Sequence, residues 1–200
     1  MKCITAMTQM CKLNFQVISE RNDLHQKNTF IRWQQKLNTN LLGLSIDSNA
    51  SHLAWVNEIY NLTGVSLPFP IIADRNGSIA RLYGMISNDV STTKTVRNVF
   101  IIDGNGIVRV ILTYPLNIGR FIPEIIRTVE ALQISDCADA STPANWQPGV
   151  PVIISPPQTF SELQQRLEDI KKNCNGISWY LSFKEPSQKC LNDINIEKNC

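Results

Sequence analysis

Between Leu41 and Leu132 the chain alternates between patterns typical of strands and of helices, and this order constrains the fold most. Leu41–Ile46 is a short apolar run of the kind found in strands buried on both faces. Apolar residues then recur at helical spacing until Gly64, a natural helix stop. A second short strand ends at Asp74, and a second helical pattern ends at Gly84. Because helices supply the crossovers between parallel strands, the order predicts strand–helix units with parallel strands.

A hairpin is predicted after these units. The apolar runs Val99–Ile102 and Ile107–Leu112 flank Asp103–Gly106, whose residue types accept the positive φ angles of tight turns. A longer helix should follow, with Phe121, Ile125, Val129 and Leu132 on one face. Parallel units followed by an antiparallel hairpin predict an α/β fold with a mixed central sheet and helices on both faces.

The composition changes near Ser141, which indicates a domain boundary. We expect a main domain over residues 1–140 and a small C-terminal domain over 141–200, joined by the proline-punctuated segment Thr142–Gly149. The predicted elements of the small domain are a strand at Val152–Ile154, a helix from about Phe160 to Lys172 and a strand at Trp179–Leu181, with a frayed tail over the last dozen residues.

Charge and hydropathy exclude several classes of function. Charged residues make up 18% of the chain and the formal net charge is +2, so we do not expect nucleic acid as a partner. No apolar run approaches the ~20 residues of a membrane span. The first residues contain no continuous apolar segment of a signal peptide. We therefore expect a cytoplasmic protein without a membrane partner.

The cysteine pattern predicts reduced thiols. Six cysteines are scattered along the chain without Cys-x-x-Cys spacing, at positions 3, 11, 137, 174, 190 and 200. With His25 and His52 as the only histidines, we expect no metal site and no cofactor. Most of the thiols are interpreted as small apolar fillers or incidental surface residues, with one or two carrying chemistry. No role is assigned to Cys137, Cys190 or Cys200.

Seven short segments occur in an order that carries a family resemblance. They are LLGLSID (41–47), SHLAW (51–55), FPIIAD (69–74), ARLYGM (80–85), TVR with VFIID (95–103), YP with GR (114–120) and TPANWQPG (142–149). Over about residues 35–183 the chain resembles peroxiredoxins of the AhpC/TSA superfamily, specifically the one-cysteine, peroxiredoxin-6-type branch with its extra C-terminal domain. The resemblance implies a thioredoxin-like fold.

The resemblance also implies an activity and a site. Family members are antioxidant thiol peroxidases that reduce hydrogen peroxide and organic hydroperoxides through a cysteine sulfenic acid. The implied partners are the peroxide, a thiol reductant such as thioredoxin or glutathione, and a second copy in a homodimer. Arg97 matches the family arginine beside the thiolate, and Arg120 resembles a second arginine of the same pocket.

The peroxidatic cysteine is not found where the family signature, Pro-x-x-x-Thr-x-x-Cys, would place it. That position falls near Ser19 and Glu20, and Cys11, the nearest thiol, lies about nine residues too early. Three interpretations remain open, in this order: an altered N-terminus, such as a reading-frame shift ending near Arg32; a catalytically inactive homologue acting as a dimerising or binding protein; and a rearranged loop in which Cys11 reacts.

Two further residues have alternative interpretations. Cys174 lies ahead of Ser178 and Trp179, in a segment that resembles one where some family members carry a resolving cysteine; packing beneath Trp179 is the alternative. Trp146 resembles the linker into the C-terminal domain, where it would serve either as an interface anchor or as a core residue.

Overall fold

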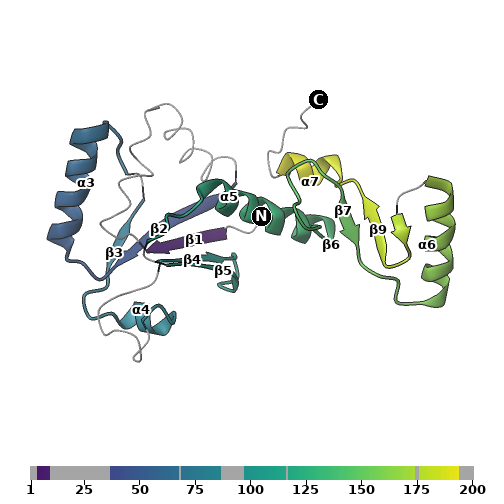
Figure 1. Ribbon diagram of the computed structural model, residues 1–200, viewed down its shortest axis with the longest axis horizontal. Helices are drawn as coiled ribbons and strands as arrows, with labels where there is room; N and C mark the ends of the chain where they lie inside the picture. The colour runs from purple at the N-terminus through teal and green to yellow at the C-terminus, as the bar shows by residue number, and fades with distance from the viewer. Residues whose placement is uncertain are drawn as a thin grey trace. The chain divides into compact units, whose positions relative to one another are not determined.

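The computed structural model describes residues 4–9, 37–67, 69–86, 97–115, 117–173 and 176–193, and element labels follow Figure 1. The chain divides into two compact units, Met1–Phe121 and Ile122–Cys200. The helix α5 (Ile122–Ala138) belongs to the second unit, whereas the sequence pattern places it before the boundary at residue 140.

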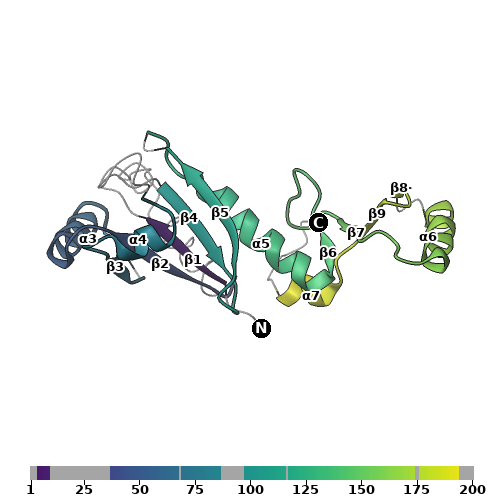
Figure 2. The ribbon, with the colours of Figure 1, turned by 90° about the horizontal axis from the view of Figure 1, so that it is seen from below.

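The first unit is built on a five-stranded mixed sheet with strand order β3-β2-β1-β4-β5. The strands are β1 (Ile4–Gln9), β2 (Thr39–Ser45), β3 (Ile71–Ala73), β4 (Arg97–Ile102) and β5 (Val108–Tyr114). Strands β1, β2 and β3 pair in parallel, and β4 is antiparallel to both β1 and β5. Figure 2 shows β4 and β5 as long neighbouring strands. The predicted α/β class with a mixed central sheet is confirmed.

Strand β1 is the main difference from the sequence prediction in this unit. The sequence shows at best a weak alternating pattern over Cys11–Ile18, which lies outside the described residues, and it predicts no strand at Ile4–Gln9. The run ITAMTQ contains two threonines and a glutamine, so its period is unclear. Pairing on both sides, with β2 and with β4, stabilises the strand where local propensity does not.

Local capping explains the two helices of this unit. Helix α3 (Asn49–Thr63) begins where the Ser48 side chain accepts a hydrogen bond from the Ser51 amide, and it ends at Gly64, whose φ of 69° suits glycine. Helix α4 (Ser78–Leu82) begins after Gly77, and the carboxylate of the buried Asp74 accepts the amides of Ile79 at 3.2 Å and Ala80 at 2.7 Å in its first turn. Helix α4 thereby packs with Met85 and Ile86 against Leu44 and Phe100.

The predicted hairpin is present between β4 and β5. The Asp103 carboxylate accepts the amides of Asn105 at 2.8 Å and Ile107 at 3.1 Å, and Gly106 takes a φ of 80°. These local bonds fix the turn that was expected from the residue types alone.

The second unit contains a four-stranded antiparallel sheet with strand order β6-β7-β9-β8. Besides α5 its elements are β6 (Ala140–Ser141), β7 (Val152–Ile154), α6 (Phe160–Asn173), β8 (Gly176–Ser178), β9 (Leu181–Lys184) and α7 (Gln188–Asp193).

The predictions for β7 and α6 are confirmed, and two others are wrong. Trp179 and Tyr180 form the turn between β8 and β9, because Ser178 pairs with Leu181 and leaves these two residues as the loop. At Gly176 the two strands approach so closely that a Cβ would lie 3.0 Å from the Leu181 carbonyl oxygen. The first residues of the tail that was expected to be frayed, 189–193, are helical as part of α7, and the rest of that tail lies outside the described residues.

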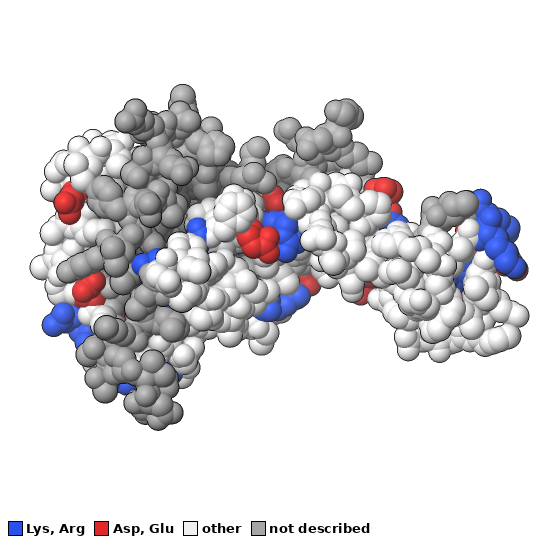
Figure 3. Space-filling model, in the orientation of Figure 1, with Lys and Arg blue, Asp and Glu red and all other residues white. Residues whose placement is uncertain are grey.

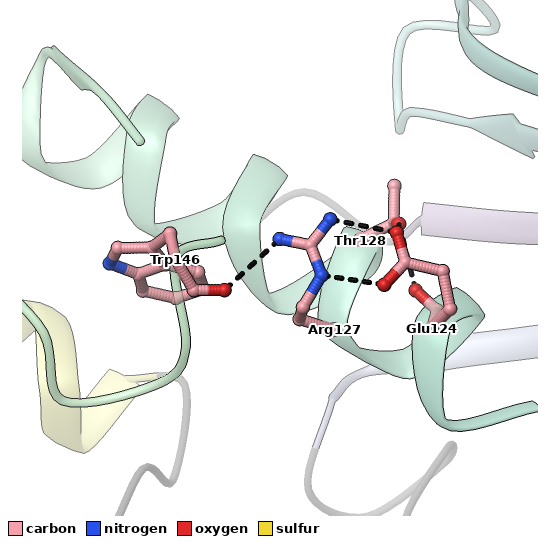
Figure 4. A network of polar contacts seen from close by, with 4 residues as sticks. All are labelled: Glu124, Arg127, Thr128 and Trp146. Atoms are coloured by element: carbon pink, nitrogen blue, oxygen red, sulfur yellow. Dashed lines mark hydrogen bonds and ion pairs between the residues drawn. The ribbon is translucent and has the colours of Figure 1, made fainter. Parts of the chain in front are cut away.

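Trp146 is a core residue, 1% exposed, so the interface-anchor interpretation is wrong for the isolated chain. Its indole Nε1 donates to the Val150 carbonyl at 2.9 Å, and its own carbonyl accepts from Arg127 at 3.2 Å. Arg127 also donates to both oxygens of Glu124, at 2.7 and 2.8 Å, as Figure 4 shows. The pair thus connects α5 to the turn around Trp146.

The expectation of reduced thiols without a role is wrong for two cysteines. Cys137, in the last turn of α5, forms a disulfide with Cys190 of α7, 53 residues further along the chain. In the chain-entropy description, closing a loop of this length stabilises the folded state by about 4 kcal/mol. The pairing of scattered cysteines is not deducible from sequence alone, which is why the bond was missed.

The Glu124–Arg127 pair predicts a pH dependence of stability. Hydrogen bonds from Arg127 lower the pKa of Glu124 below its ordinary value of 4.5. A carboxyl whose folded-state pKa is depressed stabilises the fold above its ordinary pKa, and this stabilisation is lost as the pH falls below it. Because Glu124 is 39% exposed, solvent screening keeps the effect below about 1 kcal/mol.

Glu124→Gln should therefore reduce the fall in melting temperature on acidification below pH 4.5. Thermal unfolding followed by circular dichroism across this range measures it. Glu168→Gln, which removes an exposed carboxylate from another helical ion pair, is the matched control. An acid-induced fall in the Glu124→Gln variant as steep as in the parent chain would contradict the assignment.

Candidate functional site

The candidate site lies at the end of the first unit's sheet where the parallel strands terminate. Because β1, β2 and β3 are parallel, their carboxyl ends lie at the same end of the sheet, and the antiparallel β4 begins at that end. The register pairs Thr8 with Val99, two residues after Arg97. Ligands of α/β sheets bind at such carboxyl ends. The strand order therefore brings Arg97 to the end of the sheet at which β1 finishes.

Arg97 is a buried charge held by the backbone. The residue is 4% exposed, and its Nη1 donates to the carbonyl of Ile118 at 3.0 Å. Among the described residues its buried Nε has no hydrogen-bond partner and no carboxylate forms an ion pair with it. A buried guanidinium is costly unless its charge and donors are matched, so this one favours an anionic group beside it.

Arg120 completes a reciprocal connection between β4 and the segment after β5. It is 8% exposed, and its Nη2 donates to the Asn98 carbonyl at 3.4 Å. Arg97 thus bonds to the segment that carries Arg120, while Arg120 bonds back to the residue after Arg97. We call these two bonds the arginine clasp. The structure brings together the two arginines that the sequence singled out.

Two participants in the clasp were not anticipated from the sequence. Ile118 and Asn98 contribute main-chain carbonyls, a group that every residue offers whatever its side chain. Asn98 is also buried, and its Oδ1 has no hydrogen-bond partner in the described part of the chain. Since successive residues of a strand point to opposite faces, this amide lies across the sheet from Arg97.

The candidate sulfur groups of the sequence analysis lie outside the described residues. This holds for Cys11, for the expected position near Ser19 and Glu20, and for Cys174. The arginine clasp is therefore the part of the predicted site whose geometry is known. Chemically, two buried guanidinium groups at a strand end can stabilise an anion and orient an oxygen-bearing substrate through several fixed donors.

Other kinds of site have little support in the described part of the chain. It contains no group of three or more His, Cys, Asp or Glu residues placed to hold a metal ion. None of its helices has both the length and the apolar character to cross a bilayer. On the face shown in Figure 3, Lys and Arg gather at the end of α6, where Lys171 and Lys172 stand, and are otherwise dispersed.

Comparison with known families matches both units. The sequence profile of the AhpC/TSA family matches residues 4–111, and that of the C-terminal domain of 1-Cys peroxiredoxin matches residues 131–169. The first match starts well ahead of residue 35, where the resemblance noted from the sequence begins, and it includes β1.

Individual proteins agree with the profiles. A peroxiredoxin 2 of Caldanaerobacter subterraneus is 55% identical over 148 residues, which are 74% of this chain and 66% of that protein. The solved structure of a yeast mitochondrial 1-Cys peroxiredoxin, studied for thiol resolution through glutathione and thioredoxin systems, superposes with a TM-score of 0.68 at 30% identity, covering 92% of this chain and 86% of that one.

A second solved structure, a mutant of peroxiredoxin 6 of Arenicola marina, has a TM-score of 0.69 at 26% identity and covers 94% of this chain and 86% of that one. The agreement extends over both units, since the covered share exceeds the length of either unit alone. The predicted thioredoxin-like architecture and the one-cysteine branch are confirmed.

Proposed function

The chain belongs to the AhpC/TSA family of peroxiredoxins, which are peroxidase enzymes, and on this premise we propose that it reduces hydrogen peroxide and organic hydroperoxides through a cysteine sulfenic acid. The observation that carries the proposal is the arginine clasp at the carboxyl end of the sheet. The matched segment spans about two thirds of the length of the peroxiredoxin 2 relative.

The reaction requires a thiolate and a way to stabilise the departing oxygen. The thiolate sulfur attacks one peroxide oxygen, an S–O bond forms as the O–O bond breaks, and the sulfur is oxidised by two electrons. The second oxygen leaves with the electron pair and takes a proton to become water or an alcohol. A free cysteine has a pKa of about 8.5, so nearby positive charge must lower it for reaction at neutral pH.

The clasp supplies that positive charge in a fixed place. Arg97 donates from Nη1 to the Ile118 carbonyl, which orients the guanidinium, and its Nε has no hydrogen-bond partner among the described residues and can donate to sulfur or peroxide. Burial increases the strength of these interactions, because little water screens them. Arg120, bonded to the Asn98 carbonyl, adds a second charge that favours both the thiolate and the leaving oxygen.

We propose that the sulfur comes from the chain that follows β1. Strand β1 ends at Gln9, at the end of the sheet where β4 begins with Arg97. Cys11 is the one cysteine that the sequence places between β1 and β2. We therefore assign the peroxidatic role to Cys11. The family-signature position near Ser19 has no thiol, and a serine hydroxyl is a far weaker nucleophile toward peroxide.

A thiol reductant completes the cycle. One thiol condenses with the sulfenic acid, releasing water and forming a disulfide, and a second thiol then frees the cysteine. The yeast relative was studied with glutathione and thioredoxin systems, and we propose a reductant of this class here. Such reductants are kept reduced in the cytoplasm, which is the compartment that we propose.

The proposed assembly is a homodimer formed through β5. This strand lies at the edge of the sheet, with one side paired to β4. Exposed apolar side chains on it include Val108 and Ile111. Edge strands present main-chain donors and acceptors that a second copy can pair with, and a two-fold axis would make the contact self-complementary.

Replacing Arg97 should slow sulfenic acid formation. Arg97→Ala removes charge and donors and should lower the rate constant by about a hundredfold, the usual cost of losing one donor to a developing oxyanion. Arg97→Lys keeps the positive charge but lacks the planar guanidinium, so its rate constant should lie between those of the parent chain and Arg97→Ala. Stopped-flow fluorescence with hydrogen peroxide measures the rate, with Arg109→Ala as an arginine control on β5. An unchanged rate in Arg97→Ala would remove Arg97 from the mechanism.

Oxidation should be located at Cys11. We expect the tryptic peptide 3–12, treated with a sulfenic-acid trapping reagent after peroxide addition, to carry the adduct at Cys11. Cys11→Ser should abolish the adduct, while Cys3→Ser, which alters the other cysteine of the same peptide, should retain it. If none of the cysteines takes up oxygen at micromolar peroxide, the chain is an inactive homologue.

Dimerisation should depend on the edge strand. Ile111→Lys places a charge on each copy's β5 and should shift the mass measured by analytical ultracentrifugation from dimer to monomer. Ile107→Lys is the matched control, because Ile107 is equally exposed but lies in the hairpin turn before the strand. A dimer that persists in the Ile111→Lys variant, or a monomeric parent chain, would contradict this interface.

A further inference from the structure

The disulfide between Cys137 and Cys190 takes no part in the proposed peroxidase mechanism, which uses Cys11. It joins the end of α5 to α7 within the second unit. In the proposed cytoplasmic compartment, where glutathione and thioredoxin keep thiols reduced, a disulfide is typically transient, catalytic or redox-sensing rather than structural. The bond is therefore a candidate reactive site.

The two ends of the bond differ in access. Cys190 is 5% exposed and packs in the interior, whereas Cys137 is an exposed residue of the last helical turn of α5. Thiol–disulfide exchange begins with attack of a thiolate on one sulfur, and the attacked sulfur is the accessible one. Attack on Cys137 makes the Cys190 sulfur the leaving group.

The attachment of α7 depends on few contacts. The helix has six residues, Gln188–Asp193, which is too short to be stable by itself in water. Its amide at Cys190 donates to the Ser187 hydroxyl at 3.2 Å, and Leu191, 1% exposed, supplies its main described apolar anchor. Breaking the disulfide removes the covalent part of this attachment and leaves the burial of Cys190 and Leu191 to hold the helix.

We propose that Cys137–Cys190 is a thiol-exchange site for a low-molecular-weight thiol of the glutathione class. The thiolate attacks the Cys137 sulfur, a mixed disulfide forms there, and the Cys190 sulfur leaves with the electron pair and takes a proton. A second thiol attacks the mixed disulfide and regenerates the Cys137 thiol, so two small thiols become one small disulfide while the protein disulfide becomes a dithiol. The exchange releases α7 from α5.

Re-formation of the bond takes two electrons and two protons from the two thiols. Hydrogen peroxide accepts them and becomes two water molecules. For the identity of this oxidant the inference rests on the proposed function. Reduction of the bond does not depend on the proposed function, so the two proposals can be tested separately. A chain without peroxidase activity should give the same exchange measurement, and a failed exchange measurement leaves the peroxidase proposal untouched.

Peptide mapping tests the direction of attack. Trypsin places Cys137 in peptide 128–166 and Cys190 in peptide 190–198, apart from the other cysteines. The full chain, oxidised in air, is incubated with reduced glutathione, quenched in acid, blocked with N-ethylmaleimide and digested without reductant. We expect loss of the linked pair of peptides, glutathione on 128–166 and the maleimide on 190–198. Glutathione on 190–198, or a linked pair that persists in the native protein, would overturn the proposal.

Matched single variants give an independent measurement. With oxidised glutathione, Cys190→Ser should be modified at Cys137, and Cys137→Ser should remain unmodified at Cys190, provided that both have the parent's circular dichroism spectrum. Equal modification of the two cysteines would overturn the assignment of the accessible sulfur. If either variant fails to fold, hydrogen exchange of the parent decides: amides of residues 188–193 should exchange faster after reduction, and unchanged exchange would refute the release of α7.

Discussion

The pairing of β4 between β1 and β5 is the constraint on which both the core and the candidate site depend. Alternation along β4 sends Phe100 toward Leu44 and α4 on one face and its neighbours Val99 and Ile101 to the other, and all three are fully buried. The same register carries Arg97 to the carboxyl end of the parallel strands. A slip of one residue would exchange the two faces and move the guanidinium away from Ile118.

The arginine clasp shows how a buried charge is accommodated at this end of the sheet. Carbonyl oxygens are neutral, so the bond from Arg97 to the Ile118 carbonyl orients this guanidinium group without cancelling its charge. A carboxylate in the same place would neutralise the charge and remove its effect on a thiolate. Holding Arg97 by a main-chain carbonyl therefore keeps positive potential available for a reacting anion, at a cost in stability that the surrounding core must offset.

The sequence predicted best the features that depend on local chemistry. Gly64 ends α3 and Asp103–Gly106 closes the hairpin because positive φ angles and short side-chain-to-amide bonds are properties of those residues themselves. Arg97 and Arg120 were found through family resemblance, whereas their carbonyl partners could not be, since any residue offers a carbonyl. Strand β1 was missed because its stability comes from two neighbouring strands. The aromatic pair Trp179–Tyr180 was predicted as a strand, but the pairing of Ser178 with Leu181 makes it a turn.

The second unit has a small apolar core and is also stabilised by cross-links between its elements. Helix α6 has no buried residue among those described. Much of the interior of the unit is therefore supplied by Ile134, Trp146, Val152 and Leu191. A single core in a unit of about this size supplies only a few kcal/mol, and cross-links are a common way to add stability. Here one cross-link is ionic, from Arg127 to Glu124 and the Trp146 carbonyl, and one is covalent, from Cys137 to Cys190. The first responds to acid and the second to thiols, so the stability of this unit is tied to the same redox chemistry that a peroxide-reducing protein encounters.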